Sequence, residues 1–305
     1  MSNAVGAIAT RDNMSVRVAV VTGANKGIGL EIVRALCRHF GQDGVVYLTA
    51  RNEGRGRAAV ELLQKEGLDP KFHLLDVTDQ ASIDTIRNHL EKEHGGIDVL
   101  VNNAGIGTSK DNSSFYEKQF RVMEANFFGL LSVCRSLTPL VRSGGRIVNV
   151  ASTTGYMVFR EQLTEEIRNR FRQVKEEQDV VNLMNEFLEC CKMETNAANG
   201  WSEWSYGVGK LGVILLSKIQ AEKISLNESK QDILVNACCP GFVQTDMTAD
   251  LPDNQYGGNK VTTVEGADTP VFLALLPPGV KEPNGQFLLK RKIYDFINTD
   301  VSIQI

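Results

Sequence analysis

Short runs of β-branched and other apolar residues alternate with stretches of helix length along most of the chain, and this alternation limits the possible folds more than any other feature. It is typical of βαβ units, in which successive strands lie parallel in one sheet. Several runs are almost continuously apolar, as expected for strands that helices cover on both faces. The expected strands are 17–23, 45–51, 71–77, 98–105, 146–152, 233–241 and 285–290. We therefore predict an α/β fold with a doubly wound parallel sheet of about seven strands.

The chain between the fifth and sixth expected strands is longer than one crossover helix requires, so residues 156–200 are expected to form a helical insertion. Within it, 163–173 and 179–193 carry apolar residues at helical spacing. Their apolar stripes need a cover, most simply the body of the same domain; the alternative is a dimer interface. A length of 305 residues fits one large domain. We expect 16–305 to form it, preceded by a disordered tail at 1–15.

Composition excludes several classes of partner. The net charge of −4 provides no field for a phosphate backbone, and no apolar run is long enough to span a membrane, so neither nucleic acid nor membrane is expected. Six cysteines without a CxxC motif indicate a reducing, cytoplasmic location. Each is expected to be a small buried hydrophobe, and only Cys239 is a candidate for a reactive thiol. A small-molecule partner is predicted, and no metal site.

A glycine-rich motif, TGANKGIG at 22–29, follows the first expected strand and leads into an amphipathic helix. Glycines at 23, 27 and 29 permit a tight turn and a close backbone approach, which leaves helix N-terminal amides facing a pyrophosphate. Ordinary strand–helix turns also need glycine, so the position after the first strand is what favours a dinucleotide site. The residues assigned to this site are Gly23, Asn25, Lys26, Gly27, Ile28 and Gly29.

The end of the second strand indicates which dinucleotide binds. An NAD site would place an acidic residue there, against the ribose 2′-hydroxyl, but the chain has Ala50-Arg51-Asn52. Arg51, with Lys26 and Arg55, can neutralise a 2′-phosphate instead. The predicted cofactor is therefore NADPH or NADP+. The alternative is that these cations are only solvated surface charges.

Two further strands end in residues expected to border the cofactor, because ligands of open α/β sheets bind at the carboxyl ends of the strands. Asp76 and Val77, closing the third strand, are assigned to the adenine ring. A helix N-cap is the alternative for Asp76, although Thr78 or Asp79 would serve better. The motif NNAG, closing the fourth strand, is assigned to the nicotinamide ribose through Asn102, Ala104 and Gly105.

Tyr206 and Lys210 lie one turn apart on an expected helix and so share a face. An ammonium beside a phenol lowers the phenol pKa from about 10 and makes Tyr206 a usable proton donor. The pair alone is weak, since amphipathic helices produce such spacings by chance. Together with TGANKGIG, NNAG, Ser152 after the fifth strand and Pro240-Gly241 after the sixth, it becomes specific.

With these motifs, the chain resembles the short-chain dehydrogenase/reductase family, which has a Rossmann-type sheet, from about residue 17 to 290. NKGIGLEIVR, DVLVNNAGI and NACCPGFVQTDM are similar, more closely, to motifs of the monomeric NADPH-dependent carbonyl reductases. The resemblance implies that Tyr206 would deliver a proton and Ser152 would donate a hydrogen bond to the substrate carbonyl. Lys210 would also hold the nicotinamide ribose. Asn126 would bind a water that links Lys210 to solvent.

The resemblance also implies a cover over the nicotinamide, after the sixth strand. Pro240, Gly241, Val243 and Thr245 would close over its carboxamide, and the polar loop 246–263 would act as a lid. Substrate contacts are assigned to Ser152, Thr154, Tyr206 and Phe242. Phe242 stands where the carbonyl reductases have tryptophan and Thr154 where they have methionine, and both departures affect specificity.

The predicted function is NADPH-dependent reduction of ketones, aldehydes and quinones to alcohols, by a monomeric enzyme. One alternative is NADP-linked oxidation of a steroid- or prostaglandin-like alcohol, against which the basic 2′-phosphate site argues. Another is a non-catalytic NADP(H)-binding regulator, which would be expected to lack Tyr206 or Lys210.

Overall fold

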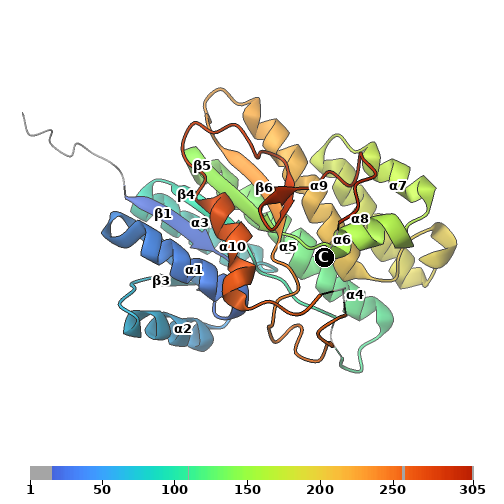
Figure 1. Ribbon diagram of the computed structural model, residues 1–305, viewed down its shortest axis with the longest axis horizontal. Coiled ribbons are helices and arrows are strands. Elements are labelled where there is room, and N and C mark those ends of the chain that lie inside the picture. Colours follow the sequence, from blue (N-terminus) through green and yellow to red (C-terminus); the bar gives the residue numbers. More distant parts are fainter. Residues whose placement is uncertain (1–15, 109, 256–257, 304–305) are drawn as a thin grey trace, which may run out of the picture.

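The computed structural model describes residues 16–303 except 109 and 256–257, so the expected tail at 1–15 lies outside the described residues. Within them, one sheet has the strand order β3-β2-β1-β4-β5-β6-β7-β8 (Figure 1). All neighbouring strands are parallel except β7 and β8, which are antiparallel. The strands are β1 (Arg17–Val21), β2 (Gly44–Ala50), β3 (Lys71–Leu74), β4 (Ile97–Asn102), β5 (Val141–Val150), β6 (Leu234–Cys239), β7 (Phe287–Leu289) and β8 (Lys292–Ile293). The predicted α/β fold with a doubly wound parallel sheet is confirmed.

Helices cover both faces of the sheet, which explains the nearly continuous apolar strands. On one face, α1 (Gly27–Phe40), α2 (Glu53–Lys65) and α10 (Thr263–Ala274) share an apolar core with alternate residues of the central strands. On the other face pack α3 (Gln80–His94), α4 (Phe115–Met123), α5 (Gly129–Leu137) and α9 (Ser205–Ser225). Short 3-10 turns are η1 (Gly41–Asp43), η3 (Thr138–Leu140) and η5 (Ala197–Asn199). No helix of the described residues has both the length and the apolarity needed to cross a membrane.

The observed bounds differ from the prediction by one or more residues in every strand, and the differences at β3, at β5 and in the additional β8 have identifiable reasons. β3 stops at Leu74, so Asp76 and Val77 follow the strand rather than close it, because this edge strand pairs only with β2. β5 begins at residue 141 instead of 146, through a Ser-Gly-Gly stretch that accommodates a shift in register against β4. β8 was not predicted, since it has only two residues, both exposed, and no apolar alternation.

The predicted helical insertion contains two amphipathic helices, α7 (Glu165–Arg172) and α8 (Glu177–Met193), preceded by α6 (Thr154–Met157) and a π-helical turn, η4 (Val158–Gln162). Their apolar stripes are buried in the same cluster as the side chains of α9. Phe171 and Phe187 both lie edge-on to Trp201, at 5.7 Å between ring centroids. The apolar stripes are therefore covered by the body of the same domain, which was the simpler of the two expectations.

Candidate active site

The glycine-rich turn joins β1 to α1 at the carboxyl edge of the sheet. Gly23 and Gly27 have φ angles of 62° and 59°, a region in which a side chain is strained. A Cβ on Gly29 would lie 2.5 Å from Asn103 Nδ2 and 2.8 Å from Ala24 Cα, so no side chain fits there. The turn therefore presents backbone at the start of α1, as a pyrophosphate site requires.

Two residues that the sequence analysis did not assign hold this turn against the end of β4. Thr22 Oγ1 accepts hydrogen bonds from the N–H groups of Asn103 and Ala104, both at 3.0 Å. Asn103 Nδ2 donates to the carbonyl oxygens of Thr22 at 3.0 Å and Gly23 at 3.1 Å. Both residues belong to the motifs TGANKGIG and NNAG, and their polar side chains could have identified them. The two predicted cofactor segments thus form one hydrogen-bonded unit.

The predicted 2′-phosphate cations lie at neighbouring strand ends. Lys26 is the N-cap residue of α1, Arg51 follows β2 directly, and Arg55 lies in the first turn of α2. All three are exposed, and β1 pairs with β2 along its whole length. Lys26 Nζ lies 2.5 Å from Asp246 Oδ2, a contact that the sequence analysis missed.

Asp76 is engaged by its own turn. Its Oδ1 accepts hydrogen bonds from Thr78 N–H at 3.0 Å and from Thr78 Oγ1 at 2.8 Å. Asp79 caps α3 instead, accepting from Ala81 N–H at 3.0 Å. The helix-cap interpretation of Asp76 is therefore wrong. Its position after β3, next to Val77, is compatible with the adenine assignment.

Asn102, the last residue of β4, points into the protein. Its Nδ2 donates to Asn149 Oδ1 at 2.8 Å and to Cys134 Sγ at 3.2 Å, and the residue is 2% exposed. Any contact of Asn102 with a cofactor would therefore come from its backbone. Ala104 and Gly105 follow it, half-buried, beyond the strand end.

Lys210 lies beneath the NNAG segment, close to Tyr206. Its Nζ donates to Val150 O at 2.7 Å and lies 5.7 Å from the centroid of the Tyr206 ring. A Cβ on Gly105 would stand 3.8 Å from the same nitrogen. Lys210 is 4% exposed, and burial lowers its pKa to about 8. At neutral pH, then, the side chain remains mostly an ammonium ion.

Trp204 packs against the phenol of Tyr206, with ring centroids 6.1 Å apart and an angle of 26° between the planes. It is the N-cap residue of α9, and its N–H donates to Ser202 Oγ at 2.9 Å. Trp204 is not among the predicted site residues, although an aromatic residue two positions before the tyrosine could have indicated it. The phenol is therefore bordered by an indole on one side and an ammonium near its ring.

Ser152 and Thr154 lie on the segment that leaves β5 and packs on the first turns of α9. Ser152 Oγ accepts a hydrogen bond from Thr154 N–H at 3.2 Å, which leaves its own proton to donate. A Cβ on Gly155 would stand 2.9 Å from Leu211 N, so this segment touches the helix of Tyr206. Thr154 is buried, and its Oγ1 has no hydrogen-bond partner among the described residues.

Asn126 lies in a π-helical turn, η2 (Glu124–Phe128), between α4 and α5. It is fully buried, which excludes a solvated surface role. Its Oδ1 accepts from Ile106 N–H at 2.8 Å, and its Nδ2 donates to Ile106 O at 2.9 Å. The side chain therefore fixes the loop after β4, and a water at Asn126 would use the remaining hydrogen-bonding capacity. π-helical turns within helices are frequent at functional sites.

The segment after β6 leads into a loop that is closed at its base. Val243 forms an isolated parallel bridge with Val261, supported by Gln244 N–H to Val261 O at 2.9 Å and Val261 N–H to Phe242 O at 2.8 Å. Phe242 is half-buried, and Lys260 Nζ lies 5.6 Å from its ring centroid. The predicted lid thus begins and ends at one anchored point.

Pro240 and Gly241 make the turn out of β6, with a φ angle of 89° at Gly241. The Thr245 side chain reaches the glycine-rich turn, since its Cγ2 would be 3.5 Å from a Cβ on Gly27. Cys239, at the end of β6, is 2% exposed and lies with its Sγ 3.7 Å from Thr153 Oγ1. All six cysteines are buried and unpaired.

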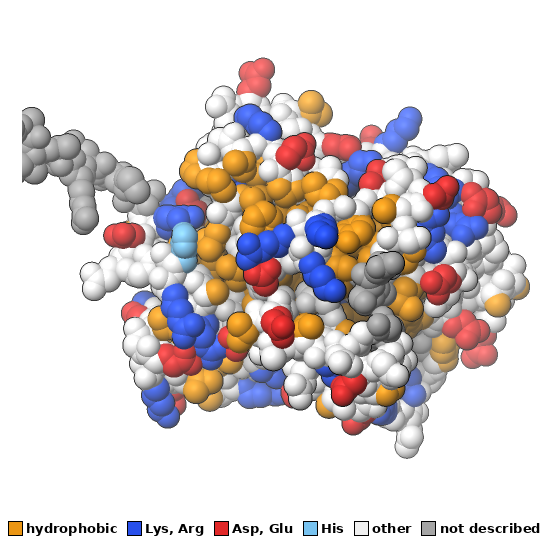
Figure 2. All heavy atoms as spheres, in the orientation of Figure 1, with side chains coloured by type: hydrophobic (Ala, Val, Ile, Leu, Met, Phe, Trp, Pro, Cys, Tyr) orange, Lys and Arg blue, Asp and Glu red, His pale blue; other side chains and the backbone are white. Residues whose placement is uncertain are grey.

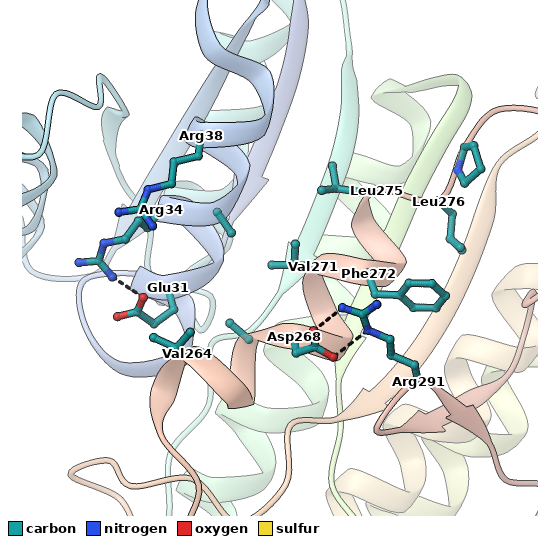
Figure 3. A pocket seen from close by; sticks show the side chains of 13 residues that line it. Glu31, Arg34, Arg38, Val264, Asp268, Val271, Phe272, Leu275, Leu276 and Arg291 are labelled. Atoms are coloured by element: carbon teal, nitrogen blue, oxygen red, sulfur yellow. Dashed lines mark hydrogen bonds and ion pairs between the residues drawn. The ribbon is translucent and has the colours of Figure 1, made fainter.

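A separate groove of about 730 Å³ lies between α1 and α10, and none of the predicted catalytic residues lines it (Figure 3). Its apolar wall includes Val271, Phe272 and Leu275. At its rim, Arg34 pairs with Glu31, and Arg291 with Asp268. Figure 2 shows hydrophobic side chains gathered on this face of the molecule, among exposed basic and acidic ones. The groove is thus apolar with neutralised charges at its edge.

The edge of the sheet therefore suits a dinucleotide and carbonyl chemistry. The glycine-rich turn excludes side chains where a pyrophosphate would lie, and exposed cations stand beside it. At the other end, a buried ammonium lies near a phenol, and the segment that carries the Ser152 hydroxyl packs on the helix of that phenol. This set can hold a nicotinamide dinucleotide and move a proton to a substrate oxygen.

Comparison with known proteins identifies the class. Residues 17–163 match the family model described as short chain dehydrogenase. The chain belongs to the short-chain dehydrogenase/reductase family.

The chain is 48% identical over 274 residues to carbonyl reductase (NADPH) 3 of Rattus norvegicus, covering 89% of this chain and 95% of that protein. It is 46% identical over 282 residues to carbonyl reductase (NADPH) 1 of Homo sapiens, covering 91% and 98%. Among solved structures, salutaridine reductase from Papaver somniferum superposes with a TM-score of 0.75 at 30% identity, covering 89% of this chain and 99% of that one.

Proposed function

We infer that this chain is an NADPH-dependent carbonyl reductase that converts ketones, aldehydes and quinones to alcohols. The observation that carries the inference is the Lys210 ammonium, buried beside the Tyr206 phenol at the edge that holds the glycine-rich turn. The identity of 46–48% to carbonyl reductases, over nearly their whole length, supports it.

Bound NADPH supplies a hydride to the carbonyl carbon, and the reaction takes up one proton. Tyr206 Oη would give that proton to the carbonyl oxygen, and Ser152 Oγ would donate a hydrogen bond to the same oxygen as negative charge develops on it. Lys210 favours the phenolate left on Tyr206 by its positive charge. Solvent then returns a proton to Tyr206, and Asn126 would hold a water on that route.

The cofactor contacts are proposed along the same edge. The glycine-rich turn from Gly23 to Gly29 would hold the pyrophosphate, and Arg51 with Lys26 would neutralise the 2′-phosphate. The lack of an acidic residue at Arg51 and Asn52, directly after β2, supports NADPH over NADH. Val77 and Asp76 would border the adenine; Gly105 and Ala104 would border the ribose of the nicotinamide.

The alternatives account less well for these residues. A non-catalytic NADP(H)-binding regulator has no need of a buried ammonium beside a phenol, and both are present. Oxidation of an alcohol would use the same groups in reverse, but cells keep NADP mostly reduced, which drives a 2′-phosphate-binding site towards reduction. The substrate side is proposed to involve Thr154 and Phe242 next to Ser152 and Tyr206.

We also propose that residues 16–305 form a single domain that acts as a monomer in the cytoplasm. The burial of the α7 and α8 stripes in the same apolar cluster as the side chains of α9 supports the monomer, because these stripes are already covered within the chain. Six buried cysteines without a disulfide support a reducing compartment.

The proposal is tested by following NADPH oxidation with a panel of quinones, dicarbonyls and aromatic aldehydes. We expect turnover with several of them, and much less with NADH. If no member of the panel is turned over while NADPH still binds, the regulator alternative is favoured.

A further inference from the structure

Asp246 stands where it can compete for a cofactor cation. Its Oδ2 lies 2.5 Å from Lys26 Nζ, although the two residues are 220 positions apart in the chain. We propose that Asp246 competes with the 2′-phosphate of NADPH for Lys26, and so limits the preference of the site for NADPH over NADH. This inference rests on the proposed function and adds a specificity-determining residue to it.

The turn that presents Asp246 is fixed by hydrogen bonds on both of its sides. Thr248 Oγ1 donates to Val243 O at 2.6 Å, and Thr245 N–H donates to Thr248 Oγ1 at 3.1 Å. Val243 is itself held in the bridge to Val261. The carboxylate of Asp246 is therefore positioned beside the glycine-rich turn by the backbone of residues 243–248, and not only by its attraction to Lys26.

The charges make the competition one-sided. The Lys26 ammonium holds the pKa of Asp246 below its usual range, so the carboxylate is ionised at neutral pH. A 2′-phosphate carries more negative charge than a carboxylate, and both would seek the same single positive charge. The side chains of Lys26 and Asp246 are 58% and 78% exposed, and ion pairs of this exposure are weak. The 2′-phosphate can therefore displace Asp246 from Lys26, and breaking this ion pair lowers the affinity for NADPH. NADH has no 2′-phosphate, so its affinity does not depend on this displacement.

The displacement would also loosen the lid on one side. Besides the Lys26 pair, the loop is attached by Asp250, whose Oδ2 lies 2.7 Å from Lys110 Nζ on the loop after β4. When a 2′-phosphate pairs with Lys26, Asp246 loses its ion pair to the glycine-rich turn, whereas Asp250 keeps its pair to Lys110. The presence of the 2′-phosphate is thereby coupled to the freedom of the lid.

The test compares Asp246→Asn with Asp250→Asn. Asp250 lies on the same loop, is similarly exposed and also pairs with a lysine, but that lysine is Lys110 and not Lys26. Dissociation constants for NADPH and for NADH are measured by fluorescence titration on the wild type and both variants. We expect Asp246→Asn to bind NADPH about two- to fivefold more tightly, because an exposed ion pair contributes little, and NADH unchanged. Asp250→Asn should leave the ratio of the two constants unchanged, because its lysine is not assigned to the 2′-phosphate.

A second readout uses nucleotides that lack the nicotinamide. Hydrogen exchange of residues 244–250 should rise with adenosine 2′,5′-bisphosphate but not with ADP, and this difference should vanish in Asp246→Asn. Unchanged NADPH affinity in Asp246→Asn, or an equal gain for NADH, would overturn the inference. If the role of Asp246 is overturned in this way but Arg51→Asp still shifts the preference from NADPH towards NADH, the proposed function stands without the Asp246 inference. If the wild type binds NADPH and NADH with equal affinity, both the proposed function and the role of Asp246 are contradicted.

Discussion

Lys210 carries its charge in a place that almost excludes water. Burial of an isolated ammonium is costly, and the Val150 carbonyl oxygen offsets part of this cost by accepting a hydrogen bond from one of its three N–H groups. Two N–H groups remain for other acceptors, such as the ribose hydroxyls of a bound nucleotide. A single side chain can thus tie the cofactor to Tyr206, whose ring lies 5.7 Å away.

The residue that we propose as the main determinant of cofactor choice is Arg51. We expect Arg51→Asp to move the ratio of kcat/KM for NADPH over NADH by about tenfold or more towards NADH, since a carboxylate repels the 2′-phosphate and can accept from a 2′-hydroxyl. Lys26→Ala should move it in the same direction, but less. The ratio is measured from initial rates with one substrate. A ratio that stays at the wild-type value in Arg51→Asp would defeat the 2′-phosphate assignment.

Individual site residues could be proposed from the sequence where they belong to a motif with a known chemical role. Glycines at 23, 27 and 29, and the Tyr206–Lys210 pair, could be proposed from their spacing combined with the neighbouring motifs, because the turn and the helix fix their relative positions. The inward direction of Asn102 and the contact of Lys26 with Asp246 could not, since both depend on segments far away in the sequence. Roles of the site residues remain predictions.

Among the elements, β2 and α3 are joined by hydrogen bonds between one tyrosine and two histidines. Tyr47 Oη lies 2.9 Å from His89 Nε2 and 2.8 Å from His94 Nε2. Burial lowers the pKa of His94, and of the nearby His73 as well. A histidine with a lowered pKa in the folded state binds its proton more readily when unfolded, so acid favours unfolding.

The free energy of unfolding should therefore fall as the pH drops below the unfolded histidine pKa of about 6.5, and level off below the folded value. Urea unfolding at several pH values between about 7.5 and 5.5 measures it, a window in which most carboxylates remain ionised. The fall should be smaller in His94→Gln. His39→Gln, which replaces an exposed histidine, should behave as the wild type. An equal fall in the wild type and His94→Gln would contradict the assignment.

Elements were predictable in proportion to their length and periodicity. The insertion helices Glu165–Arg172 and Glu177–Met193 were predicted at 163–173 and 179–193, because each has an apolar stripe long enough to show helical spacing. The π-helical turn at Asn126 and the two-residue β8 have no such pattern, since hydrogen bonding rather than side-chain periodicity defines them.

In the whole molecule, the insertion covers apolar side chains of α9 that would otherwise be exposed to solvent. Deleting 160–195 should produce an aggregating or dimerising protein, because it uncovers the apolar side chains of α9 that α7 and α8 now bury. Sedimentation equilibrium at micromolar concentration should give the intact chain a mass near 33.6 kDa. Twice that mass for the intact chain, together with a monomeric deletion variant, would show that the insertion is itself the interface.

We infer that this chain reduces carbonyl compounds with NADPH and that Tyr206 donates the proton. The variant Tyr206→Phe tests this role when it is assayed for NADPH oxidation with the best substrate of the panel and for NADPH binding by fluorescence. We expect unchanged binding, since Lys210 and the glycine-rich turn remain, and a loss of about 10²–10⁴-fold in kcat, because the phenol proton is gone. Turnover by Tyr206→Phe at a substantial fraction of the wild-type rate would contradict the account.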